Sequence, residues 1–264
     1  WCYKKELRKT KMEGLTVELL SKRLRHQRTQ RTQFNYEEYQ KLLKISRARI
    51  KKGRGTRVKF DRERLHQFCI FMVGTGLRVD EALQLEWEDI RCIDREKVVN
   101  RQATETIVSA YGKDFLSQLE RYYLQINVGV SKSRPHTAYG TGSAYFAYQN
   151  LIKLYTSNPQ FNCKVGEGTI FKLHSFREGL NSLLDEADLK FEKLGDSRIK
   201  RDGKSFRHTF IQFMLNKGMS STAIAKMCGT STEMIDKYYT SNMALDTMMD
   251  TFNKVKGGHL KIVS

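Results

Sequence analysis

The sequence has little of what interrupts helices, crosslinks secreted proteins or anchors a chain in a membrane. It contains only two prolines in 264 residues, so helices can run for many residues without a break. Its five cysteines are odd in number and include no Cys-x-x-Cys pair, which argues against a disulfide framework and a zinc site. No apolar run approaches the ~18 residues that span a bilayer, and no charged-then-apolar leader opens the chain. We therefore expect a soluble globular protein of the reducing cytoplasm, with no membrane partner.

Acidic residues are also few relative to basic ones. Lys and Arg number 47 against 29 Asp and Glu, a formal net charge of +18. Solubility needs much less charge than this, so we expect a polyanion as partner, nucleic acid in preference to a membrane surface. The stretch KRLRHQRTQRTQ at 22–33 suits an arm lying along phosphates. We assign 1–33 to a basic arm or interdomain linker and 34–264 to the folded domain. Because the chain begins at Trp1 rather than Met, we expect it to be a fragment of a longer protein.

Apolar spacing predicts a mainly helical domain of the α+β class with a small antiparallel β-sheet. Two core helices are expected on either side of a Gly/Lys/Arg loop at 51–57. Ile126, Val128 and Val130 are spaced by two, which predicts a strand within 123–139 and a turn near 131–134. Further helices are expected at 113–122, 143–155, 175–187, 205–216 and 220–228 and in an amphipathic tail from about 241.

The most informative stretch is SFRHTFIQFMLNKGMSSTAIAKMCGTSTEMIDKYYTSNM at 205–243. It predicts two amphipathic helices, a glycine break at Gly218, a second break at 229–231, a short helix and a tyrosine pair. Taken alone, GMSSTAIAKMCGTS also suits a helix-turn-helix that reads a major groove. That alternative predicts a non-catalytic DNA-binding module.

The same stretch resembles the second signature box of the tyrosine recombinases, the phage-integrase type. Arg207 is followed by Thr230 after 230 − 207 = 23 residues and by Tyr239 after 239 − 207 = 32 residues. These are the separations at which the family carries its second arginine, its Gly-His and its nucleophile. The segment GTGLRVDEALQLEWEDI at 74–90 resembles the family's first signature box, and its Arg78 and Glu81 match the pattern G-L-R-x-x-E-L.

The resemblance implies phosphoryl transfer at a DNA phosphodiester, with no metal and no cofactor. Two guanidiniums, Arg78 and Arg207, would meet the charge on the phosphate oxygens, since their planar forks match that geometry. Tyr239 would attack phosphorus and hold the DNA end covalently, so that rejoining needs no ATP. Glu81 would support Arg78 through a salt bridge, and His208 is assigned a structural role.

The resemblance also implies a lysine on a β-hairpin that protonates the leaving oxygen. SKSRPHTAYG at 131–140 supplies Lys132, with Lys97 as the alternative. Lys132 follows Arg78 by 132 − 78 = 54 residues, longer than the family usually shows, so we expect an insertion between them.

Two positions depart from the family pattern. Lys204 stands where the second box normally has the histidine of His-x-x-Arg, and Thr230 stands where a histidine or tryptophan is usual. Lys204 can still donate a hydrogen bond and supply charge, whereas Thr230 offers one uncharged donor. A complete His-x-x-Arg exists at 174–177, but the residue 32 positions beyond Arg177 is Thr209 and not a tyrosine. The 32-residue spacing from Arg207 likewise favours Tyr239 over Tyr238 as the nucleophile.

The function that this resemblance implies is site-specific DNA recombination through a covalent 3′-phosphotyrosyl intermediate, as in a phage or mobile element. The expected partners are double-stranded DNA, further copies of the chain in a tetramer on DNA, and accessory DNA-bending proteins. The alternatives are the non-catalytic helix-turn-helix module and a type IB topoisomerase, which shares the chemistry but relaxes supercoils.

Overall fold

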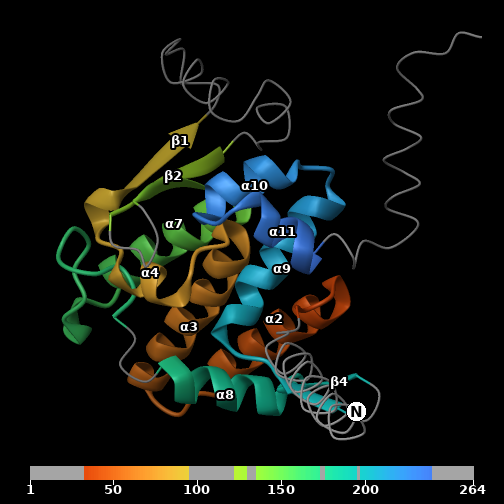
Figure 1. Ribbon diagram of the computed structural model, residues 1–264. Coiled ribbons are helices and arrows are strands. Elements are labelled where there is room, and N and C mark those ends of the chain that lie inside the picture. The colour runs from red at the N-terminus through yellow and green to blue at the C-terminus, as the bar shows by residue number, and fades with distance from the viewer. Residues whose placement is uncertain (1–32, 95–121, 130–134, 173–175, 195–196, 240–264) are drawn as a thin grey trace, which may run out of the picture.

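The computed structural model describes residues 33–94, 122–129, 135–172, 176–194 and 197–239, and most of them are helical (Figure 1). The first helices are α2 (Tyr36–Lys51), α3 (Thr56–Thr75) and α4 (Val79–Gln84), followed by the 3-10 turn η1 (Trp87–Asp89). The later ones are α7 (Gly142–Thr156), η2 (Pro159–Phe161), α8 (Phe176–Glu186), α9 (Gly203–Asn216), α10 (Ser221–Cys228) and α11 (Thr232–Tyr239). The predicted helices at 143–155, 175–187, 205–216 and 220–228 are confirmed to within two residues.

Helix α3 forms the centre of the domain. Twelve of its twenty residues are buried, including Phe68, Phe71 and Met72, so the helix is apolar around most of its circumference. A helix of this kind must be surrounded, and α3 packs against α2, α7, α8 and α9. Figure 1 shows α8 at one end of this bundle and α10 and α11 at the other.

A three-stranded antiparallel sheet covers one side of α3 and α7. Its strands are β1 (Ile90–Asp94), β2 (Tyr122–Val128) and β3 (His136–Gly140), in the order β1-β2-β3. Ile126 pairs with Ile90 on one side and with Ala138 on the other, and all three are buried. The predicted small antiparallel sheet is confirmed, but the stretch 123–139 contributes two strands where one was predicted.

A second, two-stranded antiparallel sheet of β4 (Phe191–Leu194) and β5 (Ser197–Lys200) lies before α9. Neither these strands nor β1 were predicted, because strands of four or five residues leave little periodic signal. The turn predicted near 131–134 lies outside the described residues, as do the tail from 241 and the arm except for Gln33. The helix predicted at 113–122 also lies outside them except for Tyr122, which begins β2.

The last three helices share an apolar cluster of their own. Phe210 from α9, Ile224 from α10 and Ile235 from α11 are fully buried in it, and β3 contributes Tyr139. The tyrosine pair lies in the last turn of α11, whereas the sequence predicted it after that helix. This cluster holds Tyr239 against α9, the helix that carries Arg207.

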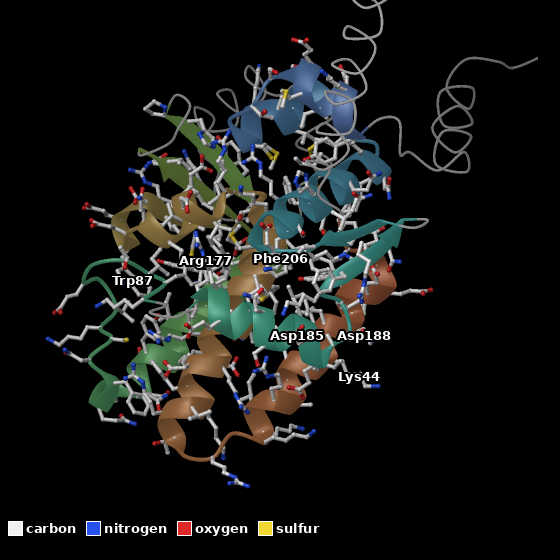
Figure 2. The ribbon with its side chains drawn as sticks, turned by 60° about the horizontal axis from the view of Figure 1, so that its bottom comes forward. Lys44, Trp87, Arg177, Asp185, Asp188 and Phe206 are labelled. Atoms are coloured by element: carbon white, nitrogen blue, oxygen red, sulfur yellow. The ribbon has the colours of Figure 1, made fainter. Side chains whose placement is uncertain are left out.

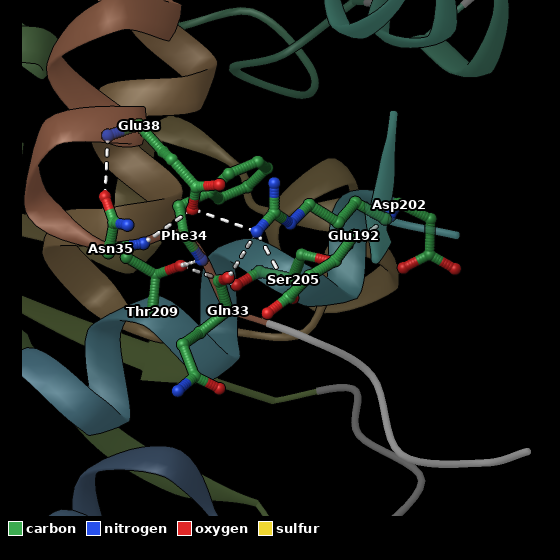
Figure 3. A network of polar contacts seen from close by, with 9 residues as sticks. Gln33, Phe34, Asn35, Glu38, Glu192, Asp202, Ser205 and Thr209 are labelled. Atoms are coloured by element: carbon green, nitrogen blue, oxygen red, sulfur yellow. Dashed lines mark hydrogen bonds and ion pairs between the residues drawn. The ribbon is translucent and has the colours of Figure 1, made fainter. Parts of the chain in front are cut away.

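Polar contacts fasten the start of the domain to α9 (Figure 3). The amide of Phe34 donates to Oγ1 of Thr209 at 2.8 Å. Nη2 of Arg201, a residue that is 2% exposed, donates to the Gln33 carbonyl at 3.3 Å, to Glu38 at 2.9 Å and to Glu192 at 3.2 Å. A buried cation thus joins the start of the domain to the segment before α9, more than 160 positions away in the sequence.

Among the helices in the described ranges, none combines the length and the apolar character that crossing a bilayer requires.

Candidate active site

Arg78 is placed where α3 ends and α4 begins. Gly76 closes α3 in the left-handed conformation (φ 66°), which favours glycine, and a Cβ there would clash with the Phe210 ring. Arg78 then occupies the N-cap of α4. Nη1 of Arg78 donates to Oε1 of Glu81 at 2.6 Å, and its backbone amide donates to Oε2 at 2.8 Å. The expected support of Arg78 by Glu81 is present in the geometry.

Arg207 extends from α9 to the same place. Its Nη1 donates to the Gly76 carbonyl at 3.0 Å and lies 3.9 Å from Oε2 of Glu81. Its Nη2 donates to the Cys228 carbonyl at 2.6 Å. The Glu81 carboxylate is 2% exposed and lies between the two guanidiniums, so the three side chains carry a net charge of +1. A group of this charge in a partly buried position is suited to a phosphate.

The C-terminal end of α10 orients both guanidiniums. The Cys228 carbonyl accepts from Arg207, and the Gly229 carbonyl accepts from Nη2 of Arg78 at 3.2 Å. Carbonyls at a helix C-terminus have no partner within the helix and attract cations. Gly229 is left-handed (φ 57°), and Thr230 follows it, half-buried, with its amide donating to the Ala225 carbonyl at 2.9 Å. Thr230 therefore lies beside the arginine pair.

Lys204 is exposed in the first turn of α9. Its backbone amide donates to Oδ1 of Asp202, the N-cap residue, at 2.8 Å. Arg207 follows three positions later, so the two side chains leave the helix on the same side. The ammonium of Lys204 has no hydrogen bond or ion pair within the part of the chain that the structure describes.

Tyr239 faces inward at the end of α11. The residue is 8% exposed, and its hydroxyl is hydrogen-bonded to Nδ1 of His208, whose ring centroid lies 5.4 Å away. Burial raises the pKa of Tyr239 well above its usual value, and the nearby charge of Arg207 offsets part of this rise. The hydroxyl is therefore protonated at neutral pH, and His208 is the side chain that orients it.

The remaining candidates are not brought into this site by the described residues. Lys132, its alternative Lys97 and His174 lie outside them, and the side chain of Tyr238 is not described. Arg177 is exposed on α8 (Figure 2), and no contact joins it to the arginine pair. Among the described residues, no group of three or more His, Cys, Asp or Glu side chains is arranged to hold a metal ion.

Sequence reasoning missed His136, at the start of β3. A Cβ added at Gly229 would lie 2.6 Å from Cε1 and 2.7 Å from Nδ1 of its ring, so the imidazole covers the backbone of Gly229. The sequence contains no spacing that would indicate this contact, because the two residues lie 93 positions apart (229 − 136) and on different elements.

In the comparison of the sequence with protein-family models, the phage integrase family matches residues 32–244. The chain belongs to this family. The match includes Arg78, Glu81, Lys204, Arg207, Thr230 and Tyr239, and it confirms the predicted resemblance. No curated protein matches the sequence of this family member.

Solved structures confirm the fold class of this phage integrase family member. A XerH site-specific recombinase, in a post-cleavage complex with a palindromic difH substrate, is 17% identical with a TM-score of 0.54. The alignment covers 86% of this chain and 54% of XerH. A XerA recombinase is 13% identical with a TM-score of 0.51, and the alignment covers 86% of this chain and 65% of XerA. The chain thus spans about half to two thirds of these proteins, and the likeness concerns the fold.

Proposed function

We propose that this chain is the catalytic part of a site-specific DNA recombinase that cleaves and rejoins DNA strands through Tyr239. The observation that carries the proposal is the convergence of Arg78, Glu81 and Arg207 on the end of α10, with Tyr239 in the adjoining cluster. Membership in the phage integrase family supports it. The net charge of +18 supports double-stranded DNA as the substrate.

The arginine pair binds the scissile phosphate in this mechanism. Arg78 donates to one backbone carbonyl and Arg207 donates to two. Because a guanidinium carries five N–H groups, both side chains can also donate to the non-bridging oxygens. Because Glu81 and the carbonyls fix both forks in advance, little reorganisation is needed when negative charge develops on those oxygens. Replacing Arg78 by Lys would remove the planar fork and is expected to slow cleavage about 10²- to 10³-fold.

The covalent step exchanges one phosphoester for another. The Tyr239 oxygen forms a bond to phosphorus, the bond from phosphorus to the 5′ oxygen breaks, and a 3′-phosphotyrosyl linkage and a 5′ hydroxyl result. The tyrosine must give up a proton, and His208 is the acceptor that its hydroxyl already contacts. Attack requires the hydroxyl to leave His208 for the phosphate. Rejoining reverses these steps and consumes no ATP.

The leaving 5′ oxygen must gain a proton, and we assign this step to Lys132, with Lys97 as the alternative. Support comes from His136, because the residue four positions after Lys132 lies against Gly229. Four residues can span at most about 14 Å, and this short separation along the chain favours Lys132 over Lys97. Lys204, on the Arg207 side of α9, and Thr230 are assigned phosphate contacts.

Full recombination is proposed to need more than one copy of the chain. Exchange of strands between two sites requires two cleavages at each, so we propose a tetramer on DNA and assistance from DNA-bending proteins. The basic segment 22–33 is proposed to lie along the backbone of the same DNA. We propose that the protein acts on this DNA in the cytoplasm of a host cell.

The test is formation of a covalent adduct with DNA. The chain is incubated with a pool of nicked duplexes of randomised sequence, in which cleavage releases a short fragment and traps the intermediate. We expect a protein–DNA band that survives denaturation and is absent from Tyr239→Phe. Tyr36→Phe, which changes a tyrosine that is 66% exposed on α2, is the matched control and should retain the band.

Four outcomes would overturn the proposal. An undiminished adduct in Tyr239→Phe would reject this nucleophile, and a band lost only in Tyr238→Phe would move the role to its neighbour. Binding of duplex DNA by the intact chain without an adduct at any salt concentration would favour the non-catalytic helix-turn-helix module. Relaxation of a supercoiled plasmid of arbitrary sequence by a monomer would favour a type IB topoisomerase.

A further inference from the structure

His136 is the side chain that occupies the space above Gly229. A Cβ at position 229 would lie 2.6, 2.7 and 3.0 Å from Cε1, Nδ1 and Nε2 of the ring, distances too short for any side chain to fit. The contact joins two elements, since β3 packs against α10 and Gly229 is the C-cap of α10. Two features therefore require glycine at position 229: its positive φ of 57°, which other residues rarely adopt, and the imidazole ring, which leaves no room for a Cβ.

Gly229 is one of the two residues at the end of α10 whose carbonyls accept from the arginine pair. Its carbonyl accepts from Nη2 of Arg78 at 3.2 Å, and the preceding Cys228 carbonyl accepts from Nη2 of Arg207 at 2.6 Å. These two carbonyls belong to the peptide units on either side of the Gly229 Cα, so a shift of the backbone at Gly229 would move both acceptors. The His136 ring packs on the backbone that carries these two acceptors, and so bears on the direction of both guanidiniums.

We propose that His136 is a positioning residue: its ring packs on Gly229 and fixes the Cys228 and Gly229 carbonyls that orient Arg78 and Arg207. The expected effect of His136 on cleavage rests on the proposed function. Its effect on the backbone turn at Gly229 rests on the packing contact alone, so that effect can be tested whether or not the chain cleaves DNA.

The structural test measures amide hydrogen exchange at the end of α10. The amides of Gly229 and Thr230 donate to the carbonyls of Lys226 and Ala225, at 3.3 and 2.9 Å, and report on this turn. In His136→Ala we expect both amides to exchange about tenfold faster than in the wild type. His136→Phe, which keeps a planar ring in place, should restore slow exchange.

The matched control is Thr137→Ala, the next position on β3. Side chains alternate between the two faces of a strand, so Thr137 points away from the side of His136. This variant should leave exchange at 229 and 230 unchanged. Exchange that is unchanged in His136→Ala, or accelerated equally in Thr137→Ala, would overturn the proposal.

The catalytic test is a double-mutant cycle in single-turnover cleavage of the nicked duplex pool. His136→Ala is expected to cleave roughly 10- to 100-fold more slowly, because small displacements of positioning groups have effects of that size. Gly229→Ala should be slower still, and part of its loss should disappear when His136→Ala removes the ring that its methyl group meets. His136→Phe should cleave at nearly the wild-type rate.

The outcomes separate this inference from the proposed function. Additive effects of the two alanine substitutions would show that the residues do not act on each other and would reject the inference. A His136→Phe variant as slow as His136→Ala would show that a ring nitrogen is needed and would also reject it. If the wild-type chain gives no adduct, the proposed function fails, and the exchange measurement alone decides whether His136 fixes the turn.

Discussion

At the scale of single residues, the site depends on one buried carboxylate between two cations. Glu81 binds the amide and guanidinium of Arg78 and lies 3.9 Å from Arg207. Without it, two guanidiniums would share a partly buried position and lack the carboxylate that offsets their charge. Glu81 therefore permits the site to hold two arginines in the absence of DNA.

Replacement of Glu81 by Gln is expected to lower the free energy of unfolding by about 2–3 kcal/mol, because it removes the charge that offsets both arginines. Added sulfate should restore part of the loss, since an anion can take the place of the carboxylate charge. Urea denaturation with and without sulfate measures both effects. Glu178→Gln, at an exposed position on α8, should change stability by less than about 0.5 kcal/mol. Equal losses in the two variants would contradict this reading.

The titration of His66, which lies outside the candidate active site, should make the stability of the domain depend on pH. Burial lowers the pKa of His66 to about 4, with a smaller contribution from the charge of Arg47. The unfolded chain gains this proton below about pH 6.5, whereas the folded chain resists it until about pH 4. The stabilising contribution is thus complete above pH 6.5 and is lost as the pH falls through this window.

We expect the free energy of unfolding to fall by up to about 1.4 kcal/mol per pH unit from His66 alone between pH 6.5 and 4. The comparison is urea unfolding of the wild type and of His66→Gln across this range. The variant should show a shallower decline, because its side chain does not titrate. Parallel stability curves would exclude His66 as the source.

At the scale of elements, the first turn of α9 is what places Lys204 and Arg207. Oδ1 of Asp202 accepts from the Lys204 amide at 2.8 Å, and the Asp202 amide donates to Oγ of Ser205 at 3.2 Å. This reciprocal capping box satisfies amides that the helix itself leaves unpaired. The site thus depends on how α9 begins as well as on what it packs against.

Removing this cap by Asp202→Ala should cost about 1 kcal/mol of stability, whereas Asp202→Ser should cost only a few tenths because a hydroxyl can also cap. Ser220→Ala is the matched case on α10, where the Ser220 hydroxyl accepts from the Ala223 amide at 3.2 Å. It should show a similar loss. Thermal denaturation of the four proteins checks the order, and a neutral Asp202→Ala would show that packing alone sets the start of α9.

At the scale of the whole molecule, Arg201 joins the start of the domain to the segment before α9. Its side chain is 3% exposed, whereas Glu38 and Glu192 are 26% and 33% exposed. The ring of Phe34 also lies under the guanidinium, 5.0 Å from centroid to Cζ. Contacts between residues more than 160 positions apart thus close the domain.

Arg201→Met is expected to destabilise the domain by about 3 kcal/mol, because it leaves two carboxylates close together without their cation. Arg198→Met provides the control: Arg198 is exposed and stacks on Phe191 at 5.1 Å, and its loss should cost less than about 1 kcal/mol. Denaturant midpoints of the two variants make the comparison. A loss for Arg201→Met no larger than that of the control would refute the structural role.

The sequence by itself determined most of the helices and the family, and it proposed most side chains of the candidate site. Arg78 and Glu81 lie three positions apart at a helix start, and their contact follows from local geometry that needs no knowledge of the fold. The 32-residue interval from Arg207 to Tyr239 is likewise read directly from the sequence.

Only the tertiary structure decided how these side chains are held. The acceptors for the two guanidiniums are the carbonyls of Gly76, Cys228 and Gly229, and a carbonyl is present at every position, so the sequence does not mark it. His136 reaches Gly229 from another element, and the burial of Tyr239 against His208 depends on how α11 packs on α9. Contacts of this kind join residues distant along the chain and depend on backbone position, which a linear pattern does not contain.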